Sequence, residues 1–267
     1  MKDVTEQYKN LPRGSVIILQ TTVGSTVHGT AVAGTDDRDE MAICIEPPEK
    51  VVGLHHFETM VYRTQPDGVR SGPGDLDLVI HTLRKFTRLA AKGNPSILLP
   101  LYVQPNAFVM KPHYFGHELR KARSMFLSKH VGKSFLGYLI AQKERLMGDR
   151  GQMRIKRQDL IDAYGFDTKY AGHVVRLAYQ GIELMTTGNL SLPMRKAESD
   201  EVLAIRTGKL TLQQTLTRAG ELERELRDSL DGDLLPEQPD EVAIDRFVVN
   251  AYLEMWFAGR SLGTTLT

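Results

Sequence analysis

Residues 23–45 read VGSTVHGTAVAGTDDRDEMAICI and carry the pattern from which the fold can be predicted. Gly24-Ser25 follows the apolar stretch 15–22, SVIILQTT, and Asp37-Arg38-Asp39 comes just before a second apolar stretch, 41–46. Short apolar runs that are bounded by glycine or proline predict buried strands. We therefore expect two strands joined by a glycine-rich connection that begins with Gly-Ser and ends with Asp-x-Asp.

The two aspartates of this stretch are candidate metal ligands. Asp37 and Asp39 lie at i and i+2, so on an extended backbone their carboxylates point to the same side. Such groups repel one another unless a cation lies between them, and hard ions such as Mg²⁺ prefer oxygen ligands. The alternative is a polar surface loop in which Arg38 neutralises its neighbours. A third carboxylate, from Asp77 or Asp75 in the predicted strand 75–81, would allow two ions about 3.5–4 Å apart.

The remainder of the chain is predicted to be largely helical. Thr82 is an expected N-cap, and the helix that follows ends at Gly93-Asn94-Pro95. Further apolar stripes predict helices over 131–147, 168–185, 211–230 and 241–257, of which the third begins with a possible capping box, Thr211 with Gln214. Strands in the first hundred residues followed by helices indicate an α+β fold trailed by a helical part. Residues 63–74 are expected to form a mobile loop, with Arg63 and Arg70 closing over a substrate.

Composition excludes several classes of protein. With 267 residues, 41% of them apolar and 25% charged, the chain is long and apolar enough to bury a core. The single cysteine, Cys44, excludes a disulfide framework and a zinc site built on several thiolates. Because the sequence has neither an apolar run of membrane-spanning length nor a secretory signal at residues 1–15, we expect a cytoplasmic protein without membrane contact.

Charge is distributed unevenly although the net charge is only +1. Residues 118–157 contain eleven Lys and Arg against three Asp and Glu, whereas residues 198–245 contain five against thirteen. A basic segment of this kind indicates either a polyanion-binding face or ordinary solvated helix faces, and the sequence leaves both open.

The order of these features resembles the DNA polymerase β-like nucleotidyltransferase superfamily, whose signature is an apolar residue, Gly-Ser or Gly-Gly, a spacer and Asp-x-Asp. The fuller pattern is similar to a phage and bacterial branch, the RNA-repair-pathway polymerase β-like proteins. The matching positions between residues 16 and 194 are Gly24-Ser25, Gly29-Thr30, Asp36-Asp37-Arg38-Asp39, Ala42-Ile43, Asp77, Leu83-Arg84-Lys85-Phe86, Gly93-Asn94-Pro95 and the helix 167–177. Arg38 and Glu40 depart from the usual apolar residues, which makes Glu40 a competing metal ligand, and Ala42 stands where the branch often has glycine.

The resemblance implies a polymerase β-like nucleotidyltransferase fold, a short mixed sheet with flanking helices, followed by a mostly helical domain. Residues 1–110 would form the catalytic domain, and residues 111–267 would complete the nucleotide and acceptor site. The implied reaction is metal-dependent transfer of NMP from an NTP to a hydroxyl, with release of pyrophosphate. Asp37, Asp39 and Asp77 would be the catalytic residues and bind two Mg²⁺ ions, for which Mn²⁺ is an alternative. Gly24 and Ser25 would hold the triphosphate.

A stripe of cationic residues supplies further candidates for nucleotide binding. Lys169, His173 and Arg176 lie at i, i+4 and i+7 and therefore share one helix face, which Gln180 and Glu183 extend toward base or sugar contacts. Such a face suits phosphate groups, although it is also common as a solvated surface. The resemblance favours the first interpretation, because the branch has Lys, His and Arg at matching places.

Several alternatives remain open at this stage. The acceptor is an RNA or DNA end, a protein hydroxyl or a small molecule, and the sequence determines neither the NTP nor the oligomeric state. A non-catalytic nucleotide-binding regulatory module and a metal-dependent nuclease that uses the same carboxylates are the competing functions.

Overall fold

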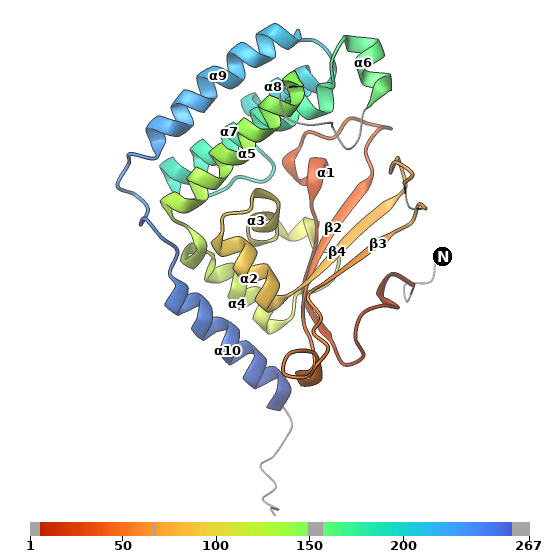
Figure 1. Cartoon of the computed structure of the whole chain (residues 1–267), viewed down its shortest axis with the longest axis vertical. Coiled ribbons are helices and arrows are strands. Elements are labelled where there is room, and N and C mark those ends of the chain that lie inside the picture. The colour runs from red at the N-terminus through yellow and green to blue at the C-terminus, as the bar shows by residue number, and fades with distance from the viewer. Residues whose placement is uncertain (1–5, 67, 149–156, 258–267) are drawn as a thin grey trace, which may run out of the picture.

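The computed structural model describes residues 6–66, 68–148 and 157–257, which form an α+β fold (Figure 1). Its sheet contains β1 (Val16–Thr22), β2 (Arg38–Ile45), β3 (Thr59–Arg63) and β4 (Leu76–Thr82) in the order β1-β2-β4-β3. β2 is antiparallel to β1 and parallel to β4, and β3 is antiparallel to β4. The expected α+β class and mixed sheet are thus confirmed, with a parallel pair of strands at the centre.

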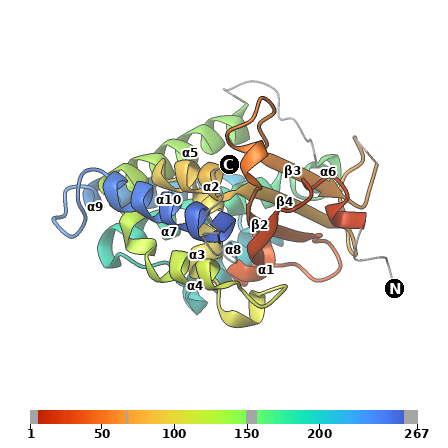
Figure 2. The same cartoon turned by 90° about the horizontal axis from the view of Figure 1, so that it is seen from below.

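The two faces of the sheet are covered differently, because successive side chains of a strand point to opposite faces. On β2, Met41 and Ile43 belong to the large core that the sheet shares with the helices. Ala42 and Cys44 belong to a smaller cluster on the other face, against which Leu11 and Tyr8 of the 3-10 helix η1 (Glu6–Tyr8) pack. Seen from below, the sheet lies to one side and most helices lie to the other (Figure 2).

Short helices connect the strands and cover the sheet. They are α1 (Gly24–His28), η2 (Pro48–Lys50), α2 (Leu83–Ala91), α3 (Pro95–Tyr102), η3 (Pro105–Ala107), α4 (Tyr114–Lys121) and η4 (Arg123–Phe126). The Thr82 side chain caps α2 by accepting from the Lys85 N–H at 3.2 Å, as predicted. The Asn94 side chain caps α3 in the same way, so the Gly93-Asn94-Pro95 stop is also the start of the next helix.

The later helices form a bundle around α7. They are α5 (Lys129–Met147), α6 (Gln158–Tyr164), α7 (Thr168–Thr187), α8 (Lys196–Arg206), α9 (Leu212–Ser229) and α10 (Glu241–Phe257). α7 packs against α5, α8 and α9 and is buried on most sides, whereas α10 returns to α2 (Figure 1). The Tyr252 hydroxyl of α10 donates to the Glu46 carboxylate at the end of β2, at 2.7 Å. No helix of the described residues has the length and apolar character needed to cross a membrane.

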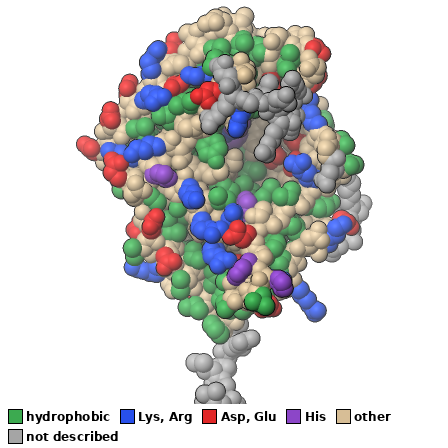
Figure 3. All heavy atoms as spheres, in the orientation of Figure 1, with side chains coloured by type: hydrophobic (Ala, Val, Ile, Leu, Met, Phe, Trp, Pro, Cys, Tyr) green, Lys and Arg blue, Asp and Glu red, His purple; other side chains and the backbone are tan. Residues whose placement is uncertain are grey.

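The uneven charge along the sequence is balanced in part by contacts between helices. Lys143 of α5 pairs with Glu223 of α9, and Lys129 and Lys133 pair with Glu237 at 3.0 and 3.4 Å. Figure 3 shows basic and acidic side chains interspersed over the visible face. Because these lysines already have carboxylate partners, the pairs support the interpretation as ordinary helix faces for part of the basic segment.

Sequence patterns found the long elements and missed several short ones. α5, α7, α9 and α10 lie where the apolar stripes predicted them, and the capping box at Thr211 is present. β3, α3, α4, α6 and α8 were not predicted, and β2 begins at Arg38 rather than at Met41. β2 starts early because it pairs with β4 from Arg38 onward, and the Arg38 N–H donates to the Asp75 carbonyl at 2.9 Å. The pairing of β2 with β4 therefore makes Asp39 a strand residue.

Phe135 provides a test of the packing between α5 and α7. It is completely buried, and its Cβ lies against the Gly181 backbone, where an added methyl group would be 3.1 Å away. Phe135→Ala should lower the free energy of unfolding by about 3–5 kcal/mol, because it leaves a cavity that rigid helices cannot close. Urea denaturation followed by circular dichroism measures this. Lys133→Ala, on the exposed side of the same helix, should change it by less than about 0.5 kcal/mol, and equal losses would contradict the packing.

Candidate active site

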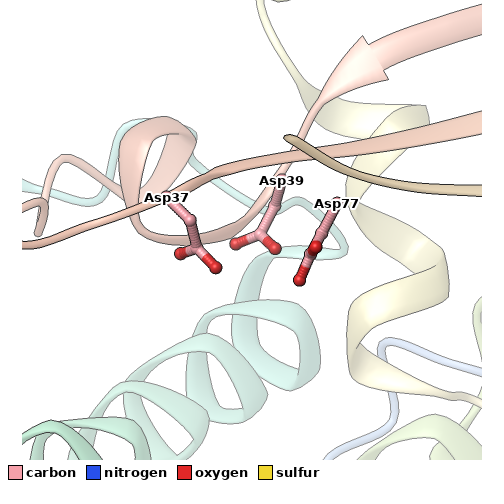
Figure 4. Close-up of side chains that lie close together, drawn as sticks. All are labelled: Asp37, Asp39 and Asp77. Atoms are coloured by element: carbon pink, nitrogen blue, oxygen red, sulfur yellow. The ribbon is translucent and has the colours of Figure 1, made fainter. Parts of the chain in front are cut away.

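Three carboxylates converge where β2 and β4 begin. Asp39 and Asp77 are direct partners in the parallel pairing of these strands, so both side chains point to the face that the helices cover. Asp37 precedes β2 by one residue, and one oxygen from each of the three carboxylates lies within 4.8 Å of the others. Figure 4 shows all three side chains directed into the same space beside a helix. Asp75 instead accepts hydrogen bonds from Thr64 and Gly72, so Asp77 is the third member of the cluster.

Burial and the neighbouring carboxylates change the ionisation of Asp39. The pKa of Asp39 is raised to about 6, first by burial and then by the negative charges of Asp37 and Asp77, against the opposing effect of Lys169. A divalent cation in this position would relieve the repulsion and replace the lost hydration with direct ligands. The oxygen donors of the cluster are of the type that Mg²⁺ and Mn²⁺ accept.

The Gly-Ser turn is fitted to Asp39. The Val23 N–H donates to the Asp39 carbonyl at 2.9 Å, which fastens the end of β1 to the start of β2. Gly24 follows with φ of +71°, and a Cβ at this position would lie 2.2 Å from the Asp39 carboxylate oxygen Oδ2. Two features therefore require glycine at position 24: the positive φ of the backbone and the close approach of the Asp39 carboxylate. Ser25 begins the turn of α1 next to the carboxylate cluster.

A pocket of about 370 Å³ opens between the sheet, α1, α7 and α8. Of the eight residues that the sequence singled out, seven line it: Gly24, Ser25, Asp39, Asp77, Lys169, His173 and Arg176. The eighth, Asp37, belongs to the carboxylate cluster. Tertiary folding thus brings residues of the strands and of α7 to one cavity, although about 130 residues separate them along the chain.

Asp36 forms ion pairs with two cations that line the pocket. Arg206 of α8 donates to both of its oxygens at 2.8 Å, and Lys169 of α7 contacts it at 2.9 Å. Although burial opposes ionisation, the hydrogen bonds from Lys169, the Val32 N–H and Arg206 hold the pKa of Asp36 below its usual value. Lys169 is farther from Asp37, at 3.9 Å. The three carboxylates of the cluster consequently keep most of their negative charge uncompensated.

Arg176 is a buried positive charge with neutral hydrogen-bond partners. Its Nη1 contacts His28 Nε2 at 2.9 Å and donates to Gln180 Oε1 at 2.6 Å, and its Nη2 contacts His173 Nε2 at 3.0 Å. Burial and the Arg176 charge lower the pKa of both His28 and His173, which keeps the imidazoles neutral. No carboxylate of the described residues forms an ion pair with Arg176. Since the residue lines the pocket, an anionic ligand there would supply the missing countercharge.

Residues of the loop before β4 hold Asp77 in place. The Gln65 side-chain amide and the Ser71 hydroxyl each donate to one Asp77 oxygen, both at 2.9 Å, and Arg63 Nε lies 3.7 Å from it. Arg63 also lines the pocket, whereas Arg70 pairs with Asp159 of α6 at 2.9 Å. Arg63 therefore faces the expected substrate position, and Arg70 instead ties the loop to the helical part.

Several site residues escaped the sequence analysis, and others lie elsewhere than expected. Arg206 and the contact of His28 with Arg176 had no local signal, because both depend on contacts between segments that are distant in sequence. Glu40 does not compete for metal, since Gln20 donates to its carboxylate at 2.7 Å and Arg38 pairs with it. Gln180 and Glu183 do not line the pocket; Gln180 supports Arg176, and Glu183 accepts hydrogen bonds from Ser191.

Sequence comparison relates this chain to one described family. The family model of the RNA repair pathway DNA polymerase beta family (RlaP) matches residues 2–250. A crystal structure of a nucleotidyltransferase-like protein from Exiguobacterium sibiricum is similar over 98% of this chain and 80% of that chain, with 12% sequence identity and a TM-score of 0.31. No curated protein sequence matches this chain.

Gly24 and Gly34 form a matched pair for testing the turn. Both have positive φ, of +71° and +73°, but a Cβ would meet Asp39 at Gly24 and nothing within 4 Å at Gly34. Both alanine variants should lose about 1 kcal/mol of stability from backbone strain, while only Gly24→Ala displaces Asp39. We expect Gly24→Ala to weaken Mn²⁺ binding at least tenfold by isothermal titration calorimetry, and Gly34→Ala to retain it. Equal affinities would remove Gly24 from the site.

The raised pKa of Asp39 predicts how metal binding depends on pH. Only the ionised carboxylate is a ligand, so protons compete with the cation below the pKa, which is about 6. Affinity should rise about tenfold between pH 5 and pH 7, whereas a carboxylate with an ordinary pKa would give almost no change over that range. Calorimetric titration with Mn²⁺ at both values tests this, and a flat profile would contradict the ionisation that we assign.

Proposed function

The chain belongs to the RNA repair pathway DNA polymerase beta family, and from this premise we propose that it is a metal-dependent nucleotidyltransferase that uses an NTP. It transfers the NMP group to a hydroxyl acceptor, a nucleic-acid end, and releases pyrophosphate. One observation carries the proposal: the pairing of Asp39 with Asp77 gathers three carboxylates at a pocket that also contains Arg176, a buried cation without a carboxylate partner among the described residues.

Asp37, Asp39 and Asp77 are the proposed ligands of two Mg²⁺ ions, for which Mn²⁺ can substitute. The donor set supports this assignment, because it consists of carboxylate oxygens whose mutual repulsion a cation would relieve. When bound, such ions neutralise phosphate charge and lower the pKa of an attacking hydroxyl.

The NTP is proposed to lie between the carboxylate cluster and α7. Gly24 leaves room for the backbone to approach the triphosphate, and the Ser25 hydroxyl donates to its oxygens. Lys169 and Arg176 supply positive charge from α7, and His173 holds Arg176 Nη2 in position. The neutral partners of Arg176 support its role, since they fix the guanidinium without consuming its charge.

Asp77 is the proposed acceptor of the proton from the attacking hydroxyl. Its carboxylate already accepts a hydrogen bond from a hydroxyl group, that of Ser71, at 2.9 Å, which supports this role. In the reaction the acceptor oxygen forms a bond to the α-phosphorus, and the bond from that phosphorus to the α–β bridging oxygen breaks. Pyrophosphate leaves, and the hydroxyl proton passes to Asp77.

We also propose a division of labour along the chain. Residues 1–110 form the catalytic domain, because they contain the sheet, the Gly-Ser turn and the carboxylates. Residues 111–267 complete the nucleotide and acceptor site by way of α7 and α8, which contribute Lys169, Arg176 and Arg206 to the pocket.

A screen of substrates tests the proposed activity. The protein is incubated with Mg²⁺ or Mn²⁺, each α-labelled NTP and total RNA, total DNA or protein as acceptor, and both labelled products and pyrophosphate are measured. Label on RNA or DNA together with pyrophosphate is expected. Tight NTP binding without pyrophosphate would favour a regulatory module, and NTP-independent degradation of nucleic acid that Asp37→Ala abolishes would favour a nuclease.

Asp39→Asn separates function from stability. It should abolish metal binding and turnover, while the free energy of unfolding at pH 7.5 stays within about 1 kcal/mol of the wild-type value or rises, because repulsion by Asp37 and Asp77 is removed. Calorimetry, the transfer assay and urea denaturation measure the three quantities. Asp200→Asn, which removes an exposed carboxylate of α8, is the matched control and should keep activity. Activity in Asp39→Asn would exclude it as a ligand.

A further inference from the structure

A second polar pocket lies outside the carboxylate site. It has a volume of about 470 Å³ and is formed by the end of α3, by α4 with η4, and by the segment that follows α7. Arg120 and Arg123 line one part of it, and Gln104, Asn189 and Ser191 contribute polar groups. The pocket is therefore rich in hydrogen-bond donors, and two of its side chains carry full positive charges.

These two arginines differ from four lysines of the same segment. Lys121, Lys129, Lys133 and Lys143 each form an ion pair with a glutamate. Arg120 and Arg123 form no ion pair with a carboxylate of the described residues. Burial and the neighbouring charge of Arg123 lower the pKa of Arg120, so the two cations repel one another in the absence of a countercharge. An anion in this pocket would remove that cost.

Both guanidinium groups are held in fixed positions. Arg120 donates from Nη1 to the Pro100 carbonyl at 2.7 Å and from Nη2 to the Val103 carbonyl at 2.6 Å, at the end of α3. The Arg123 guanidinium carbon lies 5.2 Å from the centre of the Tyr102 ring, and its Nη1 donates to the Arg120 carbonyl. Arginines that are ordered before a ligand arrives lose little side-chain entropy when they bind phosphate.

A smaller hollow lies between the arginine pocket and α1, the helix that also borders the carboxylate site. Gln104, Leu192 and Pro193 line both the arginine pocket and a smaller hollow of about 140 Å³. Thr26 and Val27 of α1 line that hollow, and their neighbours Ser25 and His28 line the carboxylate pocket. A ligand that extends from one pocket to the other must pass α1, which requires a chain rather than a mononucleotide.

We propose that the arginine pocket binds a backbone phosphate of a single-stranded polynucleotide whose terminal hydroxyl is the acceptor. The inference rests on the proposed nucleotidyl transfer and names the class of its acceptor. Arg123 contacts the phosphate directly. Arg120, which is bound to the carbonyls of α3, is a positioning residue that adds positive charge behind it.

Oligonucleotide binding without NTP tests the inference independently of catalysis. Fluorescence anisotropy measures the affinity of a fluorescein-labelled single-stranded RNA or DNA of about twelve nucleotides, a length within the usual site sizes of single-strand-binding proteins. Arg123→Gln keeps the length of the side chain and should weaken binding about tenfold and reduce the salt dependence by about one ion. Lys121→Ala removes the same charge from the exposed side of α4, next to Glu118, and should change affinity less than twofold.

A second variant guards against a folding defect in Arg123→Gln. Asn189 is exposed and lines the pocket, and Asn189→Asp introduces a negative charge there without removing an arginine. It should weaken oligonucleotide binding as Arg123→Gln does, and the circular dichroism spectrum of each variant should match the wild type. Equal losses in Arg123→Gln and Lys121→Ala, or no loss in Asn189→Asp, would overturn the proposal.

Two further arms identify the source of the phosphate and separate this inference from the proposed activity. Displacement of the oligonucleotide by millimolar inorganic phosphate, or wild-type protein that binds phosphate but no oligonucleotide, would overturn the polynucleotide assignment. Asp39→Asn should bind the oligonucleotide like the wild type. If oligonucleotide binding depends on Arg123 but no NTP is turned over, the proposed nucleotidyl transfer is wrong and the phosphate site is supported. If transfer occurs on an acceptor whose affinity Arg123→Gln leaves unchanged, the proposed phosphate site is wrong.

Discussion

The parallel pairing of β2 with β4 is the constraint on which the rest of the structure depends. It sets Asp39 beside Asp77 on one face of the sheet and brings Asp37 within reach of both. Burying Asp39 and placing it beside two further carboxylates costs free energy, and both effects raise the pKa of Asp39. The position of Asp39 also requires glycine at residue 24, because any side chain there would collide with Asp39. The strand pairing and the glycine turn therefore form one unit.

Separation of charge is the second organising feature. Asp36, adjacent to the cluster in sequence, forms ion pairs with both Lys169 and Arg206, so these two cations do not neutralise the cluster. Arg176 is surrounded by neutral imidazole and amide groups. The pocket thus keeps negative charge on the sheet and positive charge on α7. An anionic nucleotide with divalent cations would complement both walls, and it is this complementarity that the proposed function uses.

Local signals were reliable where they act within a few residues. Thr82 and Thr211 cap helices as their side chains predict, and the long amphipathic helices lie where apolar periodicity indicated. Short elements such as β3 and α3 gave weak patterns, because five to eight residues contain too few periods. Lys129, Lys133 and Lys143 belong to the basic segment for which the sequence left both a polyanion-binding face and solvated helix faces open. Their partners in space are glutamates of distant segments.

The sequence by itself determined the α+β class, the Gly-Ser turn, the Asp-x-Asp pair and the cationic face of α7, because each depends on residues that are close together along the chain. Only the tertiary structure decided that Asp77 rather than Asp75 completes the cluster, since strand register sets which side chain lies opposite Asp39. Likewise, Arg206 enters the site, and the Glu40 carboxylate stays outside the aspartate cluster, through contacts between distant segments that no local pattern encodes.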